Sequence, residues 1–319
     1  MNLQKDLKVF MVRRCLVAFL VINCFFINNV LSQEISDGGA EEWNPRSAGP
    51  LTTWTAPHCG KGKFVLQPFF FYNRTRGTFN TDGHYDSLAQ GDKKYQYQQQ
   101  LFMQYGLTDR LELDAQTVIQ ENYRKQGELK AHTDGFGDSY LFLRYCAIEE
   151  HGWIPHLTGL LQLKVPTGKY QHVDPNKLGT DLMGAASGGG SWDPGFGLTL
   201  TKKFKPFIFH ADAVYSFPQK VMVDKVKTIY GKYLNYDIGV EYFMPKGFNL
   251  MLEANGFLQG DKWQDGDRQS STDIRYLTIA PSIGWSCDKI QALLAYQRVV
   301  TGTNVDANDS VVVTCVYTF

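Results

Sequence analysis

The sequence is dominated by stretches in which apolar and polar side chains alternate residue by residue. In the stretch from Tyr233 to Met244, Tyr236 and Ile238 fall on one face while Asp237 and Glu241 fall on the other. Successive side chains of a β-strand point to opposite faces, so each stretch predicts a strand with one apolar and one polar face. We expect about twelve such strands, over residues 62–74, 94–106, 110–121, 137–148, 155–165, 194–204, 206–217, 231–244, 247–259, 273–285, 289–300 and 308–319.

The connections between these strands alternate in length along the chain. Short connections fall at residues 107–110, 149–154, 203–205, 245–247 and 286–289, and long ones at 75–93, 122–136, 166–193, 218–230, 260–272 and 301–307. This pattern is typical of an all-β, transmembrane, antiparallel up-and-down β-barrel with short periplasmic turns and long external loops. Aromatic residues near the strand ends favour the same fold, because membrane interfaces are rich in Tyr, Trp and Phe.

The N-terminal part of the chain has the layout of an export signal. Basic residues, the last of them Arg13 and Arg14, precede an apolar run from Cys15 to Leu31. This order predicts a secretory signal peptide over residues 1–32, with an uncleaved membrane anchor as the alternative. We therefore expect three parts: the signal peptide, a segment at 33–61 that is either a periplasmic tail or a short plug, and an outer-membrane β-barrel at 62–319.

The last predicted strand carries a second indication of the bacterial outer membrane. Val311, Val313, Cys315, Tyr317 and Phe319 share one face. The pattern resembles the assembly signal of outer-membrane barrels, with Tyr317 and Phe319 as its aromatic residues. The expected partners are outer-membrane lipid, the barrel assembly machinery and a small-molecule solute. The formal net charge of zero argues against nucleic acid as a partner.

Four further segments, in order along the chain, carry a family resemblance. They are residues 105–113 (YGLTDRLEL), 135–145 (GFGDSYLFLRY), 163–170 (LKVPTGKY) and 190–197 (GSWDPGFG). The chain resembles the bacterial outer-membrane family of MetA-pathway phenol-degradation proteins, or transporter-like barrels. The resemblance implies handling of aromatic compounds and brings no catalytic residues with it.

Charged residues on the polar faces are expected to line the lumen. A charge on the lipid face would cost about 2–4 kcal/mol near the bilayer midplane. The candidates are Glu112, Asp114, Arg144, Lys164, His210, Asp212, Asp237, Glu241 and Glu253. Arg144 can pair with Glu112 or Asp114 on the neighbouring strand, which favours a neutral lumen filling. Asp212, Asp237, Glu241 and Glu253 have no evident basic partner on the seventh to ninth predicted strands, which favours a cation-leaning constriction.

The longest connection is a candidate for that constriction. Residues 166–193 include a glycine-rich stretch that folds either inward over Asp212 or outward as an external loop. The constriction candidates are Gly184, Gly188, Gly189, Gly190 and Trp192.

Cysteine usage indicates neither a metal site nor a disulfide framework. The four cysteines beyond the signal have no C-x-x-C spacing. Cys59 and Cys287 are predicted on the periplasmic side about 10 Å apart, across two strand spacings. A disulfide between them is a hypothesis that the sequence leaves open. We expect no metal and no cofactor.

Taken together, these patterns predict an outer-membrane channel or transporter for small molecules, with hydrophobic or aromatic compounds among the candidates. The alternative is a structural or adhesive barrel with a closed lumen. An enzyme is not expected: His210 and Asp212 share a strand face, but no serine nucleophile is evident beside them.

Overall fold

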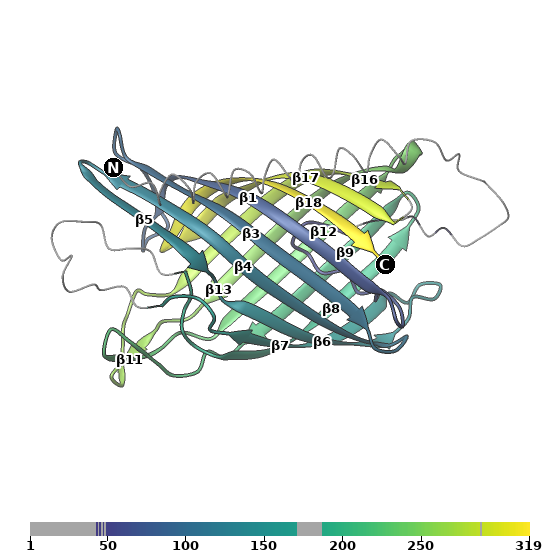
Figure 1. The fold of residues 1–319 in the computed structure, drawn as a ribbon, viewed down its shortest axis with the longest axis horizontal. Coiled ribbons are helices and arrows are strands. Elements are labelled where there is room, and N and C mark those ends of the chain that lie inside the picture. Colours follow the sequence, from purple (N-terminus) through teal and green to yellow (C-terminus); the bar gives the residue numbers. More distant parts are fainter. Residues whose placement is uncertain (1–42, 44, 46, 48, 171–186, 288) are drawn as a thin grey trace, which may run out of the picture. The chain divides into compact units, whose positions relative to one another are not determined.

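Twelve antiparallel strands close into a barrel in the computed structural model (Figure 1). The structure describes residues 43, 45, 47, 49–170, 187–287 and 289–319, and Pro45–Phe319 forms one compact unit. The barrel strands are β1 (Phe64–Phe79), β3 (Lys93–Gly106), β4 (Leu111–Gln126), β6 (Ser139–Ile148), β7 (His156–Val165), β8 (Asp193–Phe204), β9 (Phe207–Ser216), β12 (Tyr233–Phe243), β13 (Phe248–Gln259), β16 (Ile274–Cys287), β17 (Ile290–Thr303) and β18 (Val305–Thr318). Closure comes from the pairing of β1 with β18. The predicted twelve-stranded transmembrane barrel is confirmed.

The remaining elements lie in the connections. β2 (Tyr85–Ser87) pairs with β1, and η1 (Pro245–Gly247) is a 3-10 turn between β12 and β13. A separate small sheet is made of β10 (Val221–Val223), β11 (Val226–Ile229), β14 (Trp263–Gln264) and β15 (Asp267–Arg268). No helix among the described residues is long and apolar enough to cross a membrane. The predicted signal peptide at 1–32 lies outside the described residues.

Two of the six connections predicted to be long, at 122–136 and 301–307, are almost entirely strand. β4 continues past the barrel wall and pairs with β5 (Leu129–Phe136), so residues 122–136 form a hairpin. β5 and β6 together fill a single position beside β4. The connection expected at 301–307 is reduced to Asn304, whose φ of 53° makes a tight turn between β17 and β18. These residues extend the β-ladders because the ladders satisfy their backbone hydrogen bonds.

The alternation read from the sequence is the alternation of the barrel wall. On β12, Ile238 points outward with 61% of its surface exposed, while Asp237 and Glu241 point inward and are 6% and 0% exposed. Tyr236 also faces outward, where its ring covers the position that a Cβ of Gly256 would occupy on β13. An apolar exterior and a polar interior are what a lipid-embedded barrel requires.

Part of the interior is apolar as well, which the sequence pattern did not predict. Buried residues of β1, β13, β17 and β18 form a cluster around Leu51, which belongs to the segment before β1. Its members are Leu51, Phe69, Met251, Leu293, Ala295 and Val312. Residues of the segment 49–59 therefore lie inside the barrel. We call this segment the plug.

The two faces of β12 generate a first prediction. Tyr236→Lys places a charge against lipid and should lower the free energy of unfolding by about 2–4 kcal/mol near the midplane. Asp237→Lys is the matched control, because its side chain enters the lumen beside Asp212. Urea unfolding in lipid bilayers measures both variants. Equal losses of stability would contradict the register of β12.

Candidate functional site

The backbone of the plug is bound by carboxylates that project from the barrel wall. Glu253 on β13 accepts hydrogen bonds from the backbone N–H groups of Leu51 at 2.6 Å and of Thr52 and Thr53 at 2.9 Å. It also accepts one from the Thr53 hydroxyl at 3.0 Å. A backbone segment without secondary structure needs such acceptors when it is buried, and an ionised acceptor gives shorter and stronger hydrogen bonds.

Other wall residues bind the rest of the plug in the same way. The N–H of Trp54 donates to Asp212 Oδ2 at 2.7 Å, and that of Cys59 donates to Glu112 Oε2 at 2.6 Å. Preceding the plug, the hydroxyl of Ser47 donates to Glu241. The plug is thus held by β9 and β13 on one side of the barrel and by β4 across from β13.

Arg144 on β6 supplies the complementary charge. Its side chain is fully buried and its Nη1 lies 2.5 Å from Glu112 Oε1 and 3.7 Å from Asp114 Oδ2. Its Nη2 donates to the backbone carbonyl of Thr55. The pairing expected from adjacent strands is therefore present, and Arg144 adds a contact to the plug.

The ring of Trp54 anchors the plug by packing. It lies 5.4 Å from the Phe102 ring and 4.7 Å from the Phe142 ring, both at steep interplanar angles. The Arg144 guanidinium lies 5.3 Å from the Trp54 ring centroid, within cation–π range. The plug also packs closely against β12 at Gly239, where a Cβ would lie 3.0 Å from Pro50 Cγ.

Three of the four acidic residues expected to lack basic partners, Asp212, Glu241 and Glu253, are engaged in the described structure. His210 Nε2 lies 2.8 Å from Glu241 Oε1, and His210 Nδ1 lies 3.0 Å from the Thr201 hydroxyl. Glu253 and Asp212 accept plug N–H groups as described above. Glu241 therefore has His210 of β9 as a neighbour, whereas Glu253 and Asp212 are bound by backbone N–H groups of the plug instead of basic side chains. A search for basic residues on the strands could not reveal these backbone donors. The cation-leaning constriction stays a prediction.

The hypothesised disulfide between Cys59 and Cys287 is wrong, because both thiols are free. The backbone N–H of Gly62 donates to the carbonyl of Gly106 at the end of β3. This pairing directs the preceding residues toward β4, where Cys59 meets Glu112, whereas Cys287 ends β16. Burial, followed by the hydrogen bond and charge of Glu112, raises the pKa of the Cys59 thiol to about 12.

The glycine-rich loop is fixed at the rim of the barrel by a second charged cluster. Lys164 on β7 lies 2.6 Å from Asp193 and 3.5 Å from Asp138. The N–H of Gly189 donates to Asp138 Oδ2 at 2.8 Å. Gly184 lies outside the described residues, and Trp192 is half exposed.

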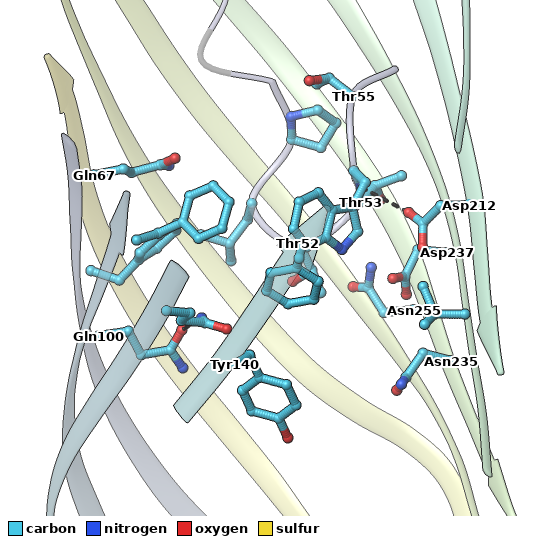
Figure 2. A pocket seen from close by; sticks show the side chains of 18 of the residues that line it. Thr52, Thr53, Thr55, Gln67, Gln100, Tyr140, Asp212, Asn235, Asp237 and Asn255 are labelled. Carbon is cyan, nitrogen blue, oxygen red and sulfur yellow. Dashed lines mark hydrogen bonds between the residues drawn. The ribbon is translucent and has the colours of Figure 1, made fainter. Parts of the chain in front are cut away.

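A cavity of about 550 Å³ adjoins the plug inside the barrel (Figure 2). Its lining includes Pro50–Thr55, amide side chains, and aromatic rings. The amides are Gln67, Gln98, Gln100, Gln104, Gln116, Gln162, Asn235, Asn255 and Gln297, and the barrel-wall rings are Phe69, Phe71, Phe102, Tyr140, Phe142 and Tyr276. None of Gly188, Gly189, Gly190 and Trp192 lines the cavity. Among the described residues the lumen is narrowed by the plug, and the inward folding of the loop over Asp212 stays a prediction.

The sequence analysis missed the aromatic half of this site. Phe69 and Phe71 point inward although Phe70 between them points outward, so β1 is apolar on both faces. The unbroken run from Phe69 to Tyr72 was the available signal, since a strand with one polar side should not contain it. Trp54, in a segment without periodicity, gave no comparable signal.

A closed antiparallel barrel with an apolar exterior and a plugged lumen defines a class, the outer-membrane β-barrel proteins. Within that class the chain belongs to the family described as "Putative MetA-pathway of phenol degradation", whose sequence profile matches residues 93–314. The resemblance noted in the four sequence segments is thereby confirmed.

One solved structure of a bacterial membrane channel has a similar fold. The chain is 17% identical to an outer membrane channel from Pseudomonas putida F1, with 86% of this chain and 100% of that chain covered at a TM-score of 0.68, which shows a shared fold. The NanC porin is more distant, at 10% identity, coverage of 79% and 98%, and a TM-score of 0.46. No protein of curated function matches the chain in sequence.

The anchoring of the plug generates a second prediction. Glu253→Ala leaves the N–H groups of Leu51, Thr52 and Thr53 without an acceptor, at a cost of about 1–3 kcal/mol for each buried donor. Displacement of the plug should then raise the alkylation rate of Cys59 at pH 8 by at least about tenfold. Mass spectrometry of alkylated peptides separates Cys59 from the other cysteines.

Glu121→Ala is the control for this experiment, because Glu121 contacts His132 on the outer face of β4 and β5 instead of the plug. It should leave the alkylation of Cys59 unchanged. An unaltered rate in Glu253→Ala would show that Glu253 does not hold the plug in place.

Proposed function

We propose that the protein is an outer-membrane channel for small amphipathic molecules, aromatic compounds among them, and that the plug closes its lumen. The observation that carries this proposal is the cavity of about 550 Å³ beside the plug. Its volume falls within the range of about 300–1,000 Å³ that is usual for small-molecule sites.

The side chains that line the cavity support an amphipathic solute. Phe69, Phe71, Phe102 and Phe142 offer ring faces and edges to an aromatic body. Gln98, Gln100 and other amides offer donors and acceptors to a hydroxyl group. A single-ring phenolic compound matches both halves, in agreement with the name of the family.

The character of the plug contacts supports a lumen that opens. The plug is held by hydrogen bonds, one ion-paired arginine and a few apolar side chains, with no covalent link to the wall. Water can replace each of these hydrogen bonds once the segment moves. The competing function is a structural or adhesive barrel with a permanently closed lumen, which the tight fit of Trp54 favours.

We further propose how the chain reaches the membrane and that it has no enzymatic role. Residues 1–32 act as the export signal, and the assembly machinery recognises Tyr317 and Phe319. In support, the Phe319 side chain is 61% exposed while its N–H is bound to the Phe64 carbonyl at 2.9 Å. His210, the one suggestive catalytic residue, is buried and engaged by Thr201 and Glu241.

Conductance through planar bilayers tests the channel. Removal of residues 45–57 should raise the single-channel conductance several-fold, because the plug is the obstruction beside the cavity. Deletion of Gly188–Gly190 is the control, since these residues do not line the cavity, and it should leave conductance close to that of the intact protein. A sealed barrel in both deletion variants would favour the structural alternative.

Removal of Phe319 tests the assembly signal. The truncated chain should accumulate in the periplasm, with much less heat-modifiable barrel in outer-membrane fractions. Phe319→Tyr keeps an aromatic ring at this position and should assemble normally. Normal surface levels of the truncated chain would show that Phe319 is not recognised.

A further inference from the structure

A row of polar side chains runs across the inner face of five adjacent strands, beside the plug. Thr199, Asp212, Asp237, Asn255 and Thr278 are directly opposite one another on β8, β9, β12, β13 and β16. All five point into the lumen and are at most 9% exposed. The last four line the cavity, and Figure 2 shows Asp212, Asp237 and Asn255 close together on one wall.

Several atoms of this row have hydrogen-bonding capacity that the described structure does not use. Asp212 Oδ2 accepts the N–H of Trp54, but Asp212 Oδ1 has no partner. The amide oxygen and nitrogen of Asn255 are both without a hydrogen-bond partner, although the residue is only 7% exposed. Buried polar groups are nearly always paired in proteins. Their position on the cavity wall therefore points to a ligand that pairs with them.

The charge of the cavity wall specifies the sign of that ligand. Cβ atoms of directly opposed residues on paired strands lie about 5 Å apart, so the carboxyl groups of Asp212 and Asp237 are close neighbours. The one basic side chain among the described lining residues is Arg144, which is bound to Glu112. A positive group with several N–H donors is the complement of two carboxyl groups and an amide oxygen, and a primary ammonium has three such donors.

The remainder of the cavity specifies the body of the ligand. Phe69, Phe71, Phe102, Phe142 and Tyr140 line the cavity together with the polar row. A small inorganic cation would use only the polar side of the cavity and would not contact these rings. An ammonium attached to an aromatic or other apolar group would use both parts of the cavity, and aromatic faces also attract cations.

We propose that the cavity binds organic monocations, with a primary ammonium group at Asp212, Asp237 and Asn255 and an apolar body against the rings. This inference rests on the proposed function only in that the site lies on the route of the solute. Binding to the intact protein is measurable whether or not the channel opens.

Three ligands with one skeleton test the proposal on the full-length protein in detergent. They are 2-phenylethylamine, which is cationic, 2-phenylethanol, which is neutral, and phenylacetate, which is anionic. Titration calorimetry should show the amine binding at least about tenfold more tightly than the alcohol, since a hydrogen bond to a charged group is worth that factor. Phenylacetate should bind most weakly.

Two substitutions separate the halves of the site. Asp237→Asn keeps the size of the side chain and removes a charge without touching the plug, so it should reduce the preference for the amine over the alcohol by about tenfold. Phe71→Leu should weaken the binding of the amine and of the alcohol by the same factor, so the preference between them should not change. Asp82→Asn, in an exposed connection, is the control and should change neither quantity. Gel mobility with and without heating verifies that each variant is folded.

Each outcome decides the proposal. Equal affinity for amine and alcohol, or an unchanged preference in the Asp237→Asn protein, would overturn it. Displacement of the amine by equimolar sodium would also overturn it, by showing a site for inorganic cations. Amine binding by a protein that never conducts would leave the site standing and refute the channel. Conductance without a preference for the amine would support the channel and refute the proposed ammonium site.

Discussion

Inside a closed barrel, every backbone N–H of an unpaired segment needs an acceptor, and this requirement organises the lumen. The plug has no strand beside it over residues 51–59, so its donors reach carboxylates of Glu253, Asp212 and Glu112. The same contacts supply the donors that these buried carboxylates need. The plug and the acidic wall each satisfy the other, which explains how Glu253 and Asp212 can face the lumen without a basic side chain bound to them.

Packing then fixes the position of the plug along the barrel. Leu51 belongs to the apolar cluster of β1, β13, β17 and β18, and Trp54 contacts Phe102 on β3 and Phe142 on β6. These two side chains lie three residues apart, and both pack against apolar side chains of the wall. A shift of the plug by one residue would exchange them with the hydroxyl groups of Thr52 and Thr55, against apolar surroundings. Polar contacts hold the plug, and apolar contacts set its register.

The sequence predicted the barrel because lipid imposes a rule on every strand. Tyr236 and Asp237 could be assigned to opposite faces without knowledge of any neighbour. The plug could not be predicted in this way, because its hydrogen-bond donors are backbone groups that any residue but proline carries. The partners of Glu253 therefore leave no mark in the composition of residues 51–53. The inward rings were hidden for a related reason: β1 packs against lipid on one face and against the plug on the other, so Phe69, Phe70 and Phe71 are all apolar.

Asp212 connects the two tasks of the lumen, closure and recognition. Its Oδ2 accepts the plug N–H of Trp54, and its Oδ1 has no hydrogen-bond partner among the described residues. In the proposed complex, an ammonium at Oδ1 draws on the same carboxylate charge that strengthens the hydrogen bond to the plug. Binding at one oxygen then changes the affinity of the other, and linkage makes the effect reciprocal. A solute of the proposed class would in this way weaken one of the contacts that keep its own path closed.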